Sequence, residues 1–226
     1  SWGSSTYIVC GAVSNTSELQ KPEDYGVKSG WGMFRVRGNI PELFTGYENT
    51  DKRYMFFTTG QSQDVEIIDD QTNGYFVEKW TNLTDSKETA SNTADGGVNT
   101  DYPLFRLADV YLMIAEAFKR GGTGIDATIV GYINDLQQRA YGDNSNNKTE
   151  DEITLSFILD ERARELYWEG YRRTDLIRYS LFTSNDYKWQ WKGGVKEGTG
   201  VNDRYNIYPI PTTELTANPN LYNENY

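Results

Sequence analysis

The feature that most constrains the fold is a change of pattern near residue 101. From there to about residue 182, four segments carry apolar residues at helical spacing, and capping residues or glycines bound most of them. Connections of modest length between consecutive helices favour antiparallel hairpins. The sequence therefore predicts a mainly α protein, with antiparallel helix pairs in its C-terminal half.

The first of these segments is predicted to be a helix over residues 101–120. Asp101 is its expected cap, Pro103 suits a first turn, and Gly121 follows as a stop signal. Positions three and four apart lie on one face of a helix. The residues expected to face inward on this basis are Leu104, Leu107, Ala108, Tyr111, Ala115 and Phe118.

Three more helices are expected after the first. The second covers residues 126–141 and ends at Gly142. Thr154 is placed to cap the third, which ends near Glu169, and the fourth covers about residues 172–182. The remaining tail is rich in proline and is expected to be irregular.

The first hundred residues have a different character. Turn signals recur through residues 1–100, and only two segments, residues 53–60 and 74–81, have the aromatic and β-branched content of strands. A small β-hairpin within long loops is expected there. We therefore divide the chain into a loop-rich region at 1–100, which is expected to carry the ligand site, and a helical region at 101–226. The two regions together are expected to form one domain.

Residue types that are rare or missing exclude several functions. There is no histidine, which rules out His-containing catalytic triads and most catalytic zinc sites. The single cysteine, Cys10, rules out an internal disulfide framework. A net charge of -11 argues against nucleic acid as a partner, because phosphate binding needs clustered basic side chains. No apolar run approaches the ~20 residues of a membrane-spanning helix.

The segment ERARELYWEGYRRTDLIRY, residues 161–179, contains five arginines and four carboxylates. Glu161 and Glu165 share a helix face, so they could act as a carboxylate pair of the glycosidase type. The signs are balanced, however, and buried charges persist only when they are paired. We therefore interpret these acids as partners of the arginines on the following helix. The residues predicted to form structural ion pairs are Arg106, Asp109, Glu161, Glu165, Arg173, Asp175 and Arg178.

Aromatic residues are abundant for so polar a chain, with 17 Tyr, 9 Phe and 6 Trp. Several lie in or near predicted loops, among them Trp31, between two glycine-containing turns, Tyr47 and Trp80. Exposed aromatic faces stack on the apolar faces of sugar rings, whereas the same rings can also pack under long loops. The excess of aromatic residues indicates a sugar site more strongly than any one position does.

Four segments of the chain resemble one family. PLFRLADVYLMIAEA, INDLQQRA, ILDERARELYWEGYRRTDLIRY and YNIYPIPTTELTANPNLYNENY follow one another in the order and spacing of the C-terminal half of the SusD/RagB family. Upstream, SGWGMFRV and ELFTGYENTDKRYMFF are similar to its Trp-Gly, Glu-Leu and Asp-x-Arg segment. The resemblance extends from about Ser29 to the last residue.

This resemblance implies a SusD-like fold of TPR-like helix pairs with long loops that carry the ligand site. It also implies a non-catalytic lipoprotein on the extracellular face of the outer membrane, in Bacteroidetes. Such a protein binds oligosaccharides and passes them to a SusC-like TonB-dependent transporter. The chain would then be the C-terminal portion of a longer protein, with the lipid anchor on its missing N-terminus as the sole membrane contact.

The residues expected to bind the glycan come from the loop-rich region. Trp31 and Tyr47 are the first stacking candidates and Trp80 the next, while Arg35 and Asn39 could supply hydrogen bonds. The sequence does not name the glycan and leaves a peptide cargo open.

Two other functions stay open from the residues alone. One is a glycoside hydrolase that uses Glu161 or Glu165, and the other is a helical-repeat module that binds a partner protein. No cofactor is expected. A structural Ca²⁺ is possible in the loops that contain Asp64, Asp69, Asp70 and Asp203, but no EF-hand spacing is present.

Overall fold

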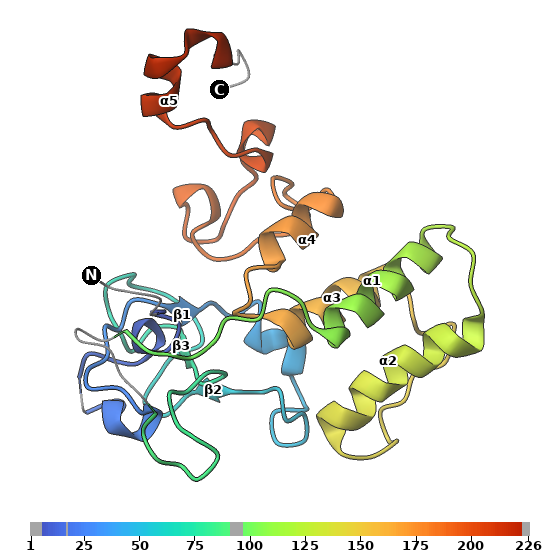
Figure 1. Ribbon diagram of the computed structural model, residues 1–226, viewed down its shortest axis with the longest axis horizontal. Helices are drawn as coiled ribbons and strands as arrows, with labels where there is room; N and C mark the ends of the chain where they lie inside the picture. Colours follow the sequence, from blue (N-terminus) through green and yellow to red (C-terminus); the bar gives the residue numbers. More distant parts are fainter. Residues whose placement is uncertain (1–5, 17, 91–96, 223–226) are drawn as a thin grey trace. The chain divides into compact units, whose positions relative to one another are not determined.

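The computed structural model describes residues 6–16, 18–90 and 97–222. The chain divides into two compact units, Ser1–Arg172 and Arg173–Tyr226, and each is described by itself. Figure 1 shows their elements along the sequence. The change from loops to helices near residue 101 falls inside the first unit.

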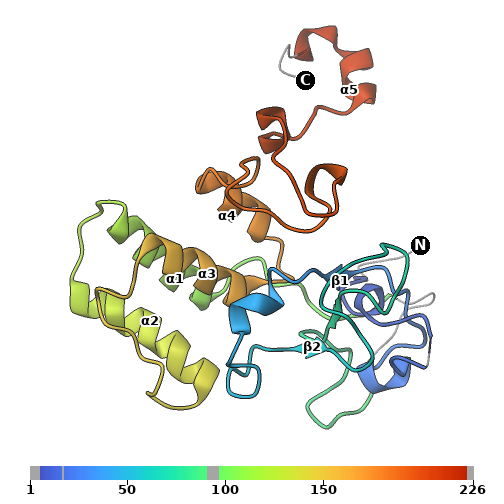
Figure 2. The ribbon, with the colours of Figure 1, turned by 180° about the vertical axis from the view of Figure 1, so that it is seen from behind.

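Three α-helices form the helical part of the first unit: α1 (Leu107–Lys119), α2 (Asp126–Tyr141) and α3 (Leu155–Leu166). α1 packs against both α2 and α3, as the views in Figures 1 and 2 show. Their shared core is aliphatic, and Leu112, Ile133 and Ile158 at its centre are fully buried. The predicted helix pairs and the mainly α fold class are confirmed.

Local signals set some of the helix bounds as predicted. α2 begins and ends at the predicted residues, and Gly142 closes it in the left-handed conformation with φ 88°. The Thr154 hydroxyl caps α3 by accepting a hydrogen bond from the Phe157 amide at 3.1 Å. α3 is shorter than predicted, because Tyr167 directly after it has ψ 148° and so leaves the helical conformation.

The predicted start of α1 was wrong. The helix begins at Leu107, and Arg106 before it is extended, with φ -149° and ψ 155°. The segment before Arg106 is held by a tertiary contact, in which the Tyr171 hydroxyl donates to the Leu104 carbonyl at 3.0 Å. Leu104 and Leu107 are exposed instead of inward.

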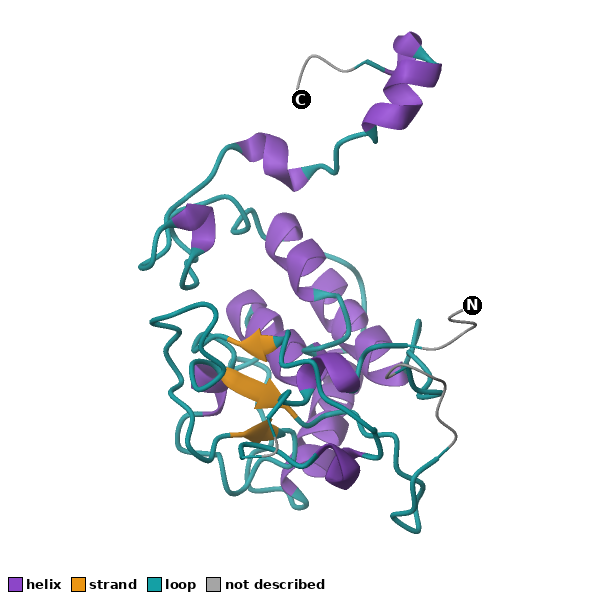
Figure 3. Cartoon of the chain, turned by 90° about the vertical axis from the view of Figure 1, so that its left-hand side faces the viewer, coloured by secondary structure: helices purple, strands orange, loops and turns teal. Residues whose placement is uncertain are grey.

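A small antiparallel sheet forms the other part of the first unit (Figure 3). Its order is β1 (Arg35–Val36), β3 (Tyr75–Val77) and β2 (Phe56–Phe57). β2 and β3 are the predicted pair, with Phe57 opposite Phe76, whereas β1 was not predicted. Short 3₁₀ turns lie among the loops at Cys10–Ala12, Pro22–Tyr25 and Pro41–Phe44.

An aromatic cluster joins the sheet to the end of α3. Phe44, Phe56 and Tyr167 are buried in it, and the Phe56 and Tyr167 ring centroids lie 5.0 Å apart. The Tyr167 hydroxyl donates to the Arg53 carbonyl at 2.7 Å. The loop-rich region and the helices of this unit are therefore connected by packing and by hydrogen bonds.

The second unit is irregular, with short helical turns. After α4 (Arg172–Arg178) it contains η5 (Lys192–Gly194), η6 (Asp203–Asn206), α5 (Thr212–Ala217) and η7 (Pro219–Leu221). α4 ends before the predicted residue 182, since Ser180 has φ 58°. The buried Lys192 organises this unit: its ammonium group donates to the carbonyls of Ser184 and Tyr187.

Candidate functional site

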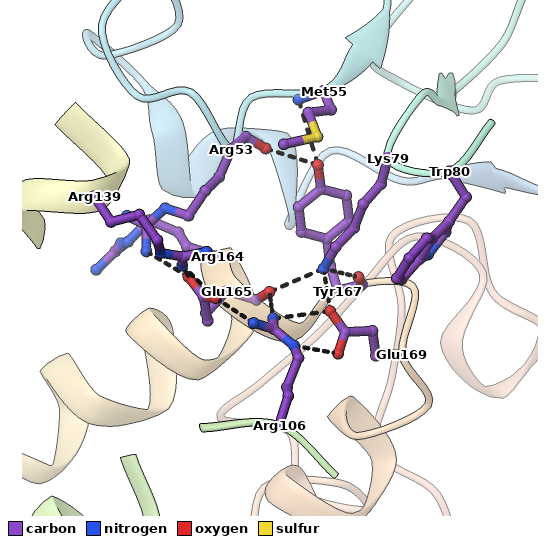
Figure 4. A pocket seen from close by; sticks show the side chains of 10 residues that line it. All are labelled: Arg53, Met55, Lys79, Trp80, Arg106, Arg139, Arg164, Glu165, Tyr167 and Glu169. Atoms are coloured by element: carbon purple, nitrogen blue, oxygen red, sulfur yellow. Dashed lines mark hydrogen bonds and ion pairs between the residues drawn. The ribbon is translucent and has the colours of Figure 1, made fainter. Parts of the chain in front are cut away.

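A recess of about 230 Å³ lies in the first unit, where the end of α3 meets the sheet and the residue before α1 (Figure 4). Its lining combines paired charges with aromatic and sulfur-containing side chains. The lining residues are Arg53, Met55, Lys79, Trp80, Arg106, Arg139, Arg164, Glu165, Tyr167 and Glu169.

Glu165 is the centre of the charges in this recess. Arg106 donates to its carboxylate at 2.6 Å, and Arg139 donates to both of its oxygens at 2.5 Å. Arg53 lies 3.3 Å from the second oxygen. Three guanidinium groups, from the segment before α1, from α2 and from the loop before β2, therefore meet on one buried carboxylate.

Glu169 and Lys79 form a second layer of the recess, beside Arg106. Arg106 donates to Glu169 at 2.7 and 2.9 Å, and the Lys79 ammonium group also binds this carboxylate. Lys79 donates further to the backbone carbonyls of Glu165 and Tyr167, both at 2.9 Å. Burial lowers the pKa of Lys79 even though Glu169 opposes the shift.

Glu161 is fully buried one turn earlier on α3. Arg53 donates to its carboxylate at 2.5 Å, Gln137 at 2.6 Å and Arg164 at 2.8 Å. Arg53 is also held by Asp51, whose carboxylate accepts from it at 2.7 and 2.9 Å. Each buried charge here has hydrogen-bonded partners of opposite sign, as stable burial requires.

This arrangement does not suit acid-base catalysis. Burial alone would raise the pKa of Glu165, but Arg139, Arg106 and Arg53 outweigh it and hold that pKa below the usual value. A general acid for glycoside cleavage needs a raised pKa so that it carries a proton near neutral pH. Glu165 stays ionised instead, and its role is to join three elements.

The ion pairs involve the predicted residues but not all of the predicted partners. Arg106, Glu161 and Glu165 pair as described above, and Asp109 pairs with Arg162 at 2.8 Å. The partners expected from the following helix were wrong, because Arg53 and Arg139 supply the cations at Glu161 and Glu165.

Two of the three residues predicted to form ion pairs in the second unit pair with each other: Asp175 and Arg178 are 2.7 Å apart within α4. Arg173 has a different environment from the expected ion pair. Its guanidinium carbon lies 4.4 Å from the Phe182 ring centroid and 4.3 Å from that of Tyr208, so the charge is stabilised by two aromatic faces.

Two of the predicted glycan-binding residues share one environment. Trp31 and Trp80 are both half-buried and pack against the same small apolar cluster, which contains Cys10 and Val98. The Trp31 ring lies 4.8 Å from the ring of Tyr7. Trp80 also lines the recess, and its indole N–H is buried without a hydrogen-bond partner among the described residues.

The other three predicted residues lie elsewhere in the first unit. Tyr47 is 44% exposed, and its ring meets that of Tyr141 edge to face at 5.7 Å. Arg35, on β1, donates to the carbonyls of Ile68 at 2.6 Å and Asn73 at 2.7 Å, so it fixes a loop. Asn39 is half-buried in the turn after β1. The five residues therefore do not form one cluster.

Several residues of the recess were not predicted. Arg53 and Lys79 come from segments that are distant from α3 in sequence, so helical spacing could not reveal them, whereas Glu169 lies only four residues after Glu165. The Asp-x-Arg pattern at residues 51–53 was the one available signal, because a charged pair beside an aromatic strand indicates buried pairing. Trp168, whose φ of 65° is unusual for a bulky residue, carried no signal in the sequence.

The described residues do not offer a metal site or a membrane span. Across residues 6–16, 18–90 and 97–222, no three Cys, Asp or Glu side chains come together in an arrangement that could hold a metal ion. None of the helices in the same ranges is both long and apolar enough to cross a lipid bilayer.

Comparison with known proteins relates most of the chain to one family. Residues 20–226 match the sequence model of the SusD family. The starch-binding protein SusD of Bacteroides thetaiotaomicron is 44% identical over 165 residues, which cover 72% of this chain and 28% of that protein. A SusD-like protein of Formosa agariphila is 31% identical over 150 residues, or 65% of this chain and 27% of that one.

Solved structures give the same result for the fold. Surface glycan-binding protein A of Bacteroides thetaiotaomicron, in complex with laminarihexaose, superposes with a TM-score of 0.70 at 23% identity, over 98% of this chain and 47% of that one. A SusD superfamily protein of Bacteroides vulgatus superposes with a TM-score of 0.59 over 88% of this chain and 41% of that one. The chain thus spans less than half the length of these relatives.

Helix pairs joined by paired buried carboxylates, together with a small sheet, define a mainly helical class of protein. The chain belongs to the SusD family, since the family match covers most of its length. The predicted family and SusD-like fold are confirmed. Two of the relatives are named for what they bind, starch in one and surface glycan in the other.

Proposed function

We propose that this chain is part of a cell-surface protein that captures oligosaccharides or polysaccharides without cleaving them. The observation that carries the proposal is the family match over residues 20–226, together with 44% identity to a starch-binding relative. The chemistry of the recess supports the absence of cleavage, because three guanidinium groups keep Glu165 ionised. A net charge of -11 also suits a neutral ligand better than an anionic one.

We further infer that the captured glycan is delivered to a SusC-like TonB-dependent transporter for nutrient uptake. The protein would then lie on the extracellular face of the outer membrane, held by a lipid anchor outside the present sequence. Family membership supports both the delivery to the transporter and the location at the outer membrane. Co-purification of the transporter with the full-length protein from outer membranes is the expected result, and its absence from repeated preparations would contradict delivery.

Among the predicted glycan contacts, Trp80 has the most structural support. Its ring lines the recess, and its buried indole N–H has no hydrogen-bond partner among the described residues. The part of the ring that lines the recess could pack on the apolar face of a sugar. Tyr47 is the second candidate, because Tyr141 holds its exposed ring at a fixed angle.

The other three predicted residues have smaller roles in the proposed glycan site. Trp31 packs on the same cluster as Trp80 and would hold that ring in position. Arg35 would act through the loop whose carbonyls it binds, and Asn39 would offer its amide from the neighbouring turn. We therefore expect Trp31, Arg35 and Asn39 substitutions to weaken binding less than loss of Trp80.

Calorimetry with a panel of oligosaccharides tests the proposal. The panel should contain starch fragments, laminarihexaose and control peptides. Trp80→Ala is expected to weaken binding by about 10- to 100-fold and Trp80→Phe by about 2- to 10-fold, because phenylalanine keeps an aromatic face, although a smaller one than indole.

Tyr205→Ala provides the matched control. Tyr205 is an exposed aromatic residue of the second unit, and its removal should leave the affinity unchanged. Thermal unfolding of each variant separates loss of binding from loss of fold. Binding of no glycan in the panel by a folded full-length protein would contradict the proposed function, as would release of shorter sugars from the ligand.

A further inference from the structure

Trp168 has a backbone conformation that bulky residues seldom adopt. Its φ of 65° lies in the left-handed region, and it is one of four non-glycine residues with positive φ in the described ranges. A Cβ makes this region unfavourable, so a residue stays there only where its surroundings enforce it. Trp168 lies between Tyr167 and Glu169, which both line the recess. An enforced backbone conformation is therefore found at the edge of the proposed glycan site.

The residues around Trp168 form a type II turn at the end of α3. The Glu169 amide donates to the Leu166 carbonyl at 3.1 Å, and Tyr167 has φ -58° and ψ 148°. The second central position of such a turn, here Trp168, requires a positive φ and normally holds glycine or asparagine. Backbone preference therefore does not explain a tryptophan at this position.

The Trp168 side chain is anchored away from the recess, which it does not line. Its indole N–H donates at 3.3 Å to the carbonyl of Ile8, 160 residues earlier in the chain. The ring also meets that of Phe34 edge to face, with centroids 6.0 Å apart, and packs against the aromatic cluster that joins the sheet to α3. These contacts can supply the stabilisation that keeps φ positive.

The turn holds the ammonium group of Lys79 from several directions (Figure 4). The carbonyls of Glu165 and Tyr167 accept from it, both at 2.9 Å, and the Glu169 carboxylate pairs with it. The same group lies 4.7 Å from the centroid of the Tyr167 ring. All of these partners belong to the end of α3 and to the turn that follows it.

The sign of φ at Trp168 determines where one of these carbonyls points. In a type I turn, which suits residues with a side chain, the peptide group between the two central residues is rotated by about half a turn relative to type II. That peptide group contains the Tyr167 carbonyl. A negative φ at Trp168 would therefore turn this carbonyl away from Lys79.

Lys79 connects the turn to the leading glycan candidate, since it directly precedes Trp80 in the chain. When the ammonium group of Lys79 is fixed, so is the backbone from which the Trp80 ring enters the recess. Glu169, the last residue of the turn, also binds Arg106, whose side chain is 24% exposed. An aromatic ring and a hydrogen-bond donor of the recess thus depend on the orientation of one peptide group.

We propose that Trp168 is a positioning residue of the glycan site. Its ring, held outside the recess, enforces the left-handed backbone that directs the Tyr167 carbonyl and the Glu169 carboxylate to Lys79, and so keeps Trp80 in its binding position. The inference rests on the proposed glycan site and adds the element that maintains its geometry.

Two variants of the full-length protein separate the backbone from the ring. Trp168→Ala and Trp168→Gly both remove the ring and its contacts, but only glycine accepts φ 65° without strain. The flipped peptide should therefore be populated about 5- to 30-fold more in the alanine variant than in the glycine variant. Trp168→Phe keeps a ring in the aromatic cluster and should behave like the parent.

Acetylation of lysines, followed by peptide mass spectrometry, reports on the peptide without any glycan. In the parent, Lys79 should react much more slowly than the exposed Lys28, because its ammonium group is bound. Lys79 should react about 5- to 30-fold faster in Trp168→Ala than in Trp168→Gly. Equal rates in these two variants would overturn the proposal.

Calorimetry with a glycan that binds the parent tests the consequence for binding. Trp168→Ala should bind about 5- to 30-fold more weakly than Trp168→Gly. A merely structural role would lower the Tm of both variants and leave their affinities equal, and equal affinities would overturn the positioning role. If the parent binds no glycan, the proposed function fails, while the acetylation rates still decide whether Trp168 sets this peptide.

A second pair of variants serves if the first pair does not fold. Trp168→Asn and Trp168→Leu retain larger side chains, and asparagine tolerates a positive φ whereas leucine does not. Lys79 should then react faster in the leucine variant than in the asparagine variant. The reverse order or equal rates would overturn the proposal.

Discussion

α1 and α2 pack against each other, yet their outward sides differ completely. The outward positions of α2 carry Asp126, Thr128 and Asp135, as expected for a helix that faces water. The corresponding positions of α1 carry Leu107, Val110 and Ile114. The comparison shows that α2 is an outer helix of its unit, whereas α1 is an inner helix with one side open.

The inner charges of α1 provide the largest test of this comparison. Asp109→Ala removes the carboxylate that faces the buried Arg162 and is expected to cost about 3–5 kcal/mol of unfolding free energy. Asp135→Ala on the exposed side of α2 should change stability by less than about 0.5 kcal/mol. Urea unfolding of both variants measures the difference, and equal costs would break the comparison.

The inner apolar sides of the two helices should respond alike. Leu112 on α1 and Ile133 on α2 are both fully buried in the same core. Leu112→Ala and Ile133→Ala are each expected to cost about 2–4 kcal/mol, from lost transfer free energy and the cavity left behind. A much smaller cost at Leu112, measured by the same urea titration, would mean that α1 is not anchored on this side.

Acid should weaken the connection that both helices share. Arg106, before α1, and Arg139, on α2, both bind Glu165, and the arginines hold its pKa below the 4.5 of an unperturbed glutamate. A carboxylate with a lowered pKa stabilises the fold above its ordinary pKa, and that stability is lost as the pH falls through the lowered value.

The stability difference between the parent chain and Glu165→Gln should therefore be large near pH 7 and shrink below about pH 4.5. Chemical unfolding over a series of pH values checks this. A difference that stays constant down to pH 3 would show that Glu165 contributes through packing instead of charge.

The smallest expected effect concerns the outer side of α2. Gly131 is exposed within the helix, and a Cβ added there meets nothing within 4 Å. Gly131→Ala should stabilise the protein by about 0.4–1 kcal/mol, because alanine restricts the unfolded chain more than glycine does. A loss of stability, measured by urea unfolding, would contradict the open environment of Gly131.

The two helices also show how much of the fold could be predicted from the sequence. The bounds of α2 follow from a single apolar stripe and the stop at Gly142, so local signals suffice. α1 is apolar on two sides, so periodicity alone could not separate them. The predicted stripe was right at Ala108, Tyr111, Ala115 and Phe118 and wrong at Leu104 and Leu107. The start of α1 was missed because a tertiary contact at Leu104 holds the preceding segment extended.

The candidate site was less accessible to prediction. The acids Glu161 and Glu165 stand out in the sequence, but Arg53 reaches them from a loop 108 and 112 residues away. Only folding brings such residues together, and no local pattern encodes the pairing. The aromatic candidates were chosen by type and by loop position, which cannot reveal that Trp31 and Trp80 share a cluster while Tyr47 lies apart.

Methionine oxidation tests most directly the central claim that α1, unlike α2, leaves an apolar side open in this chain. Met113 on that side and Met33 in the loop before β1 are 46% and 60% exposed, whereas Met55 in the recess is half-buried. Peroxide should therefore oxidise Met113 and Met33 faster than Met55, as peptide mass spectrometry can show. Oxidation of Met113 as slow as that of Met55 would contradict the account.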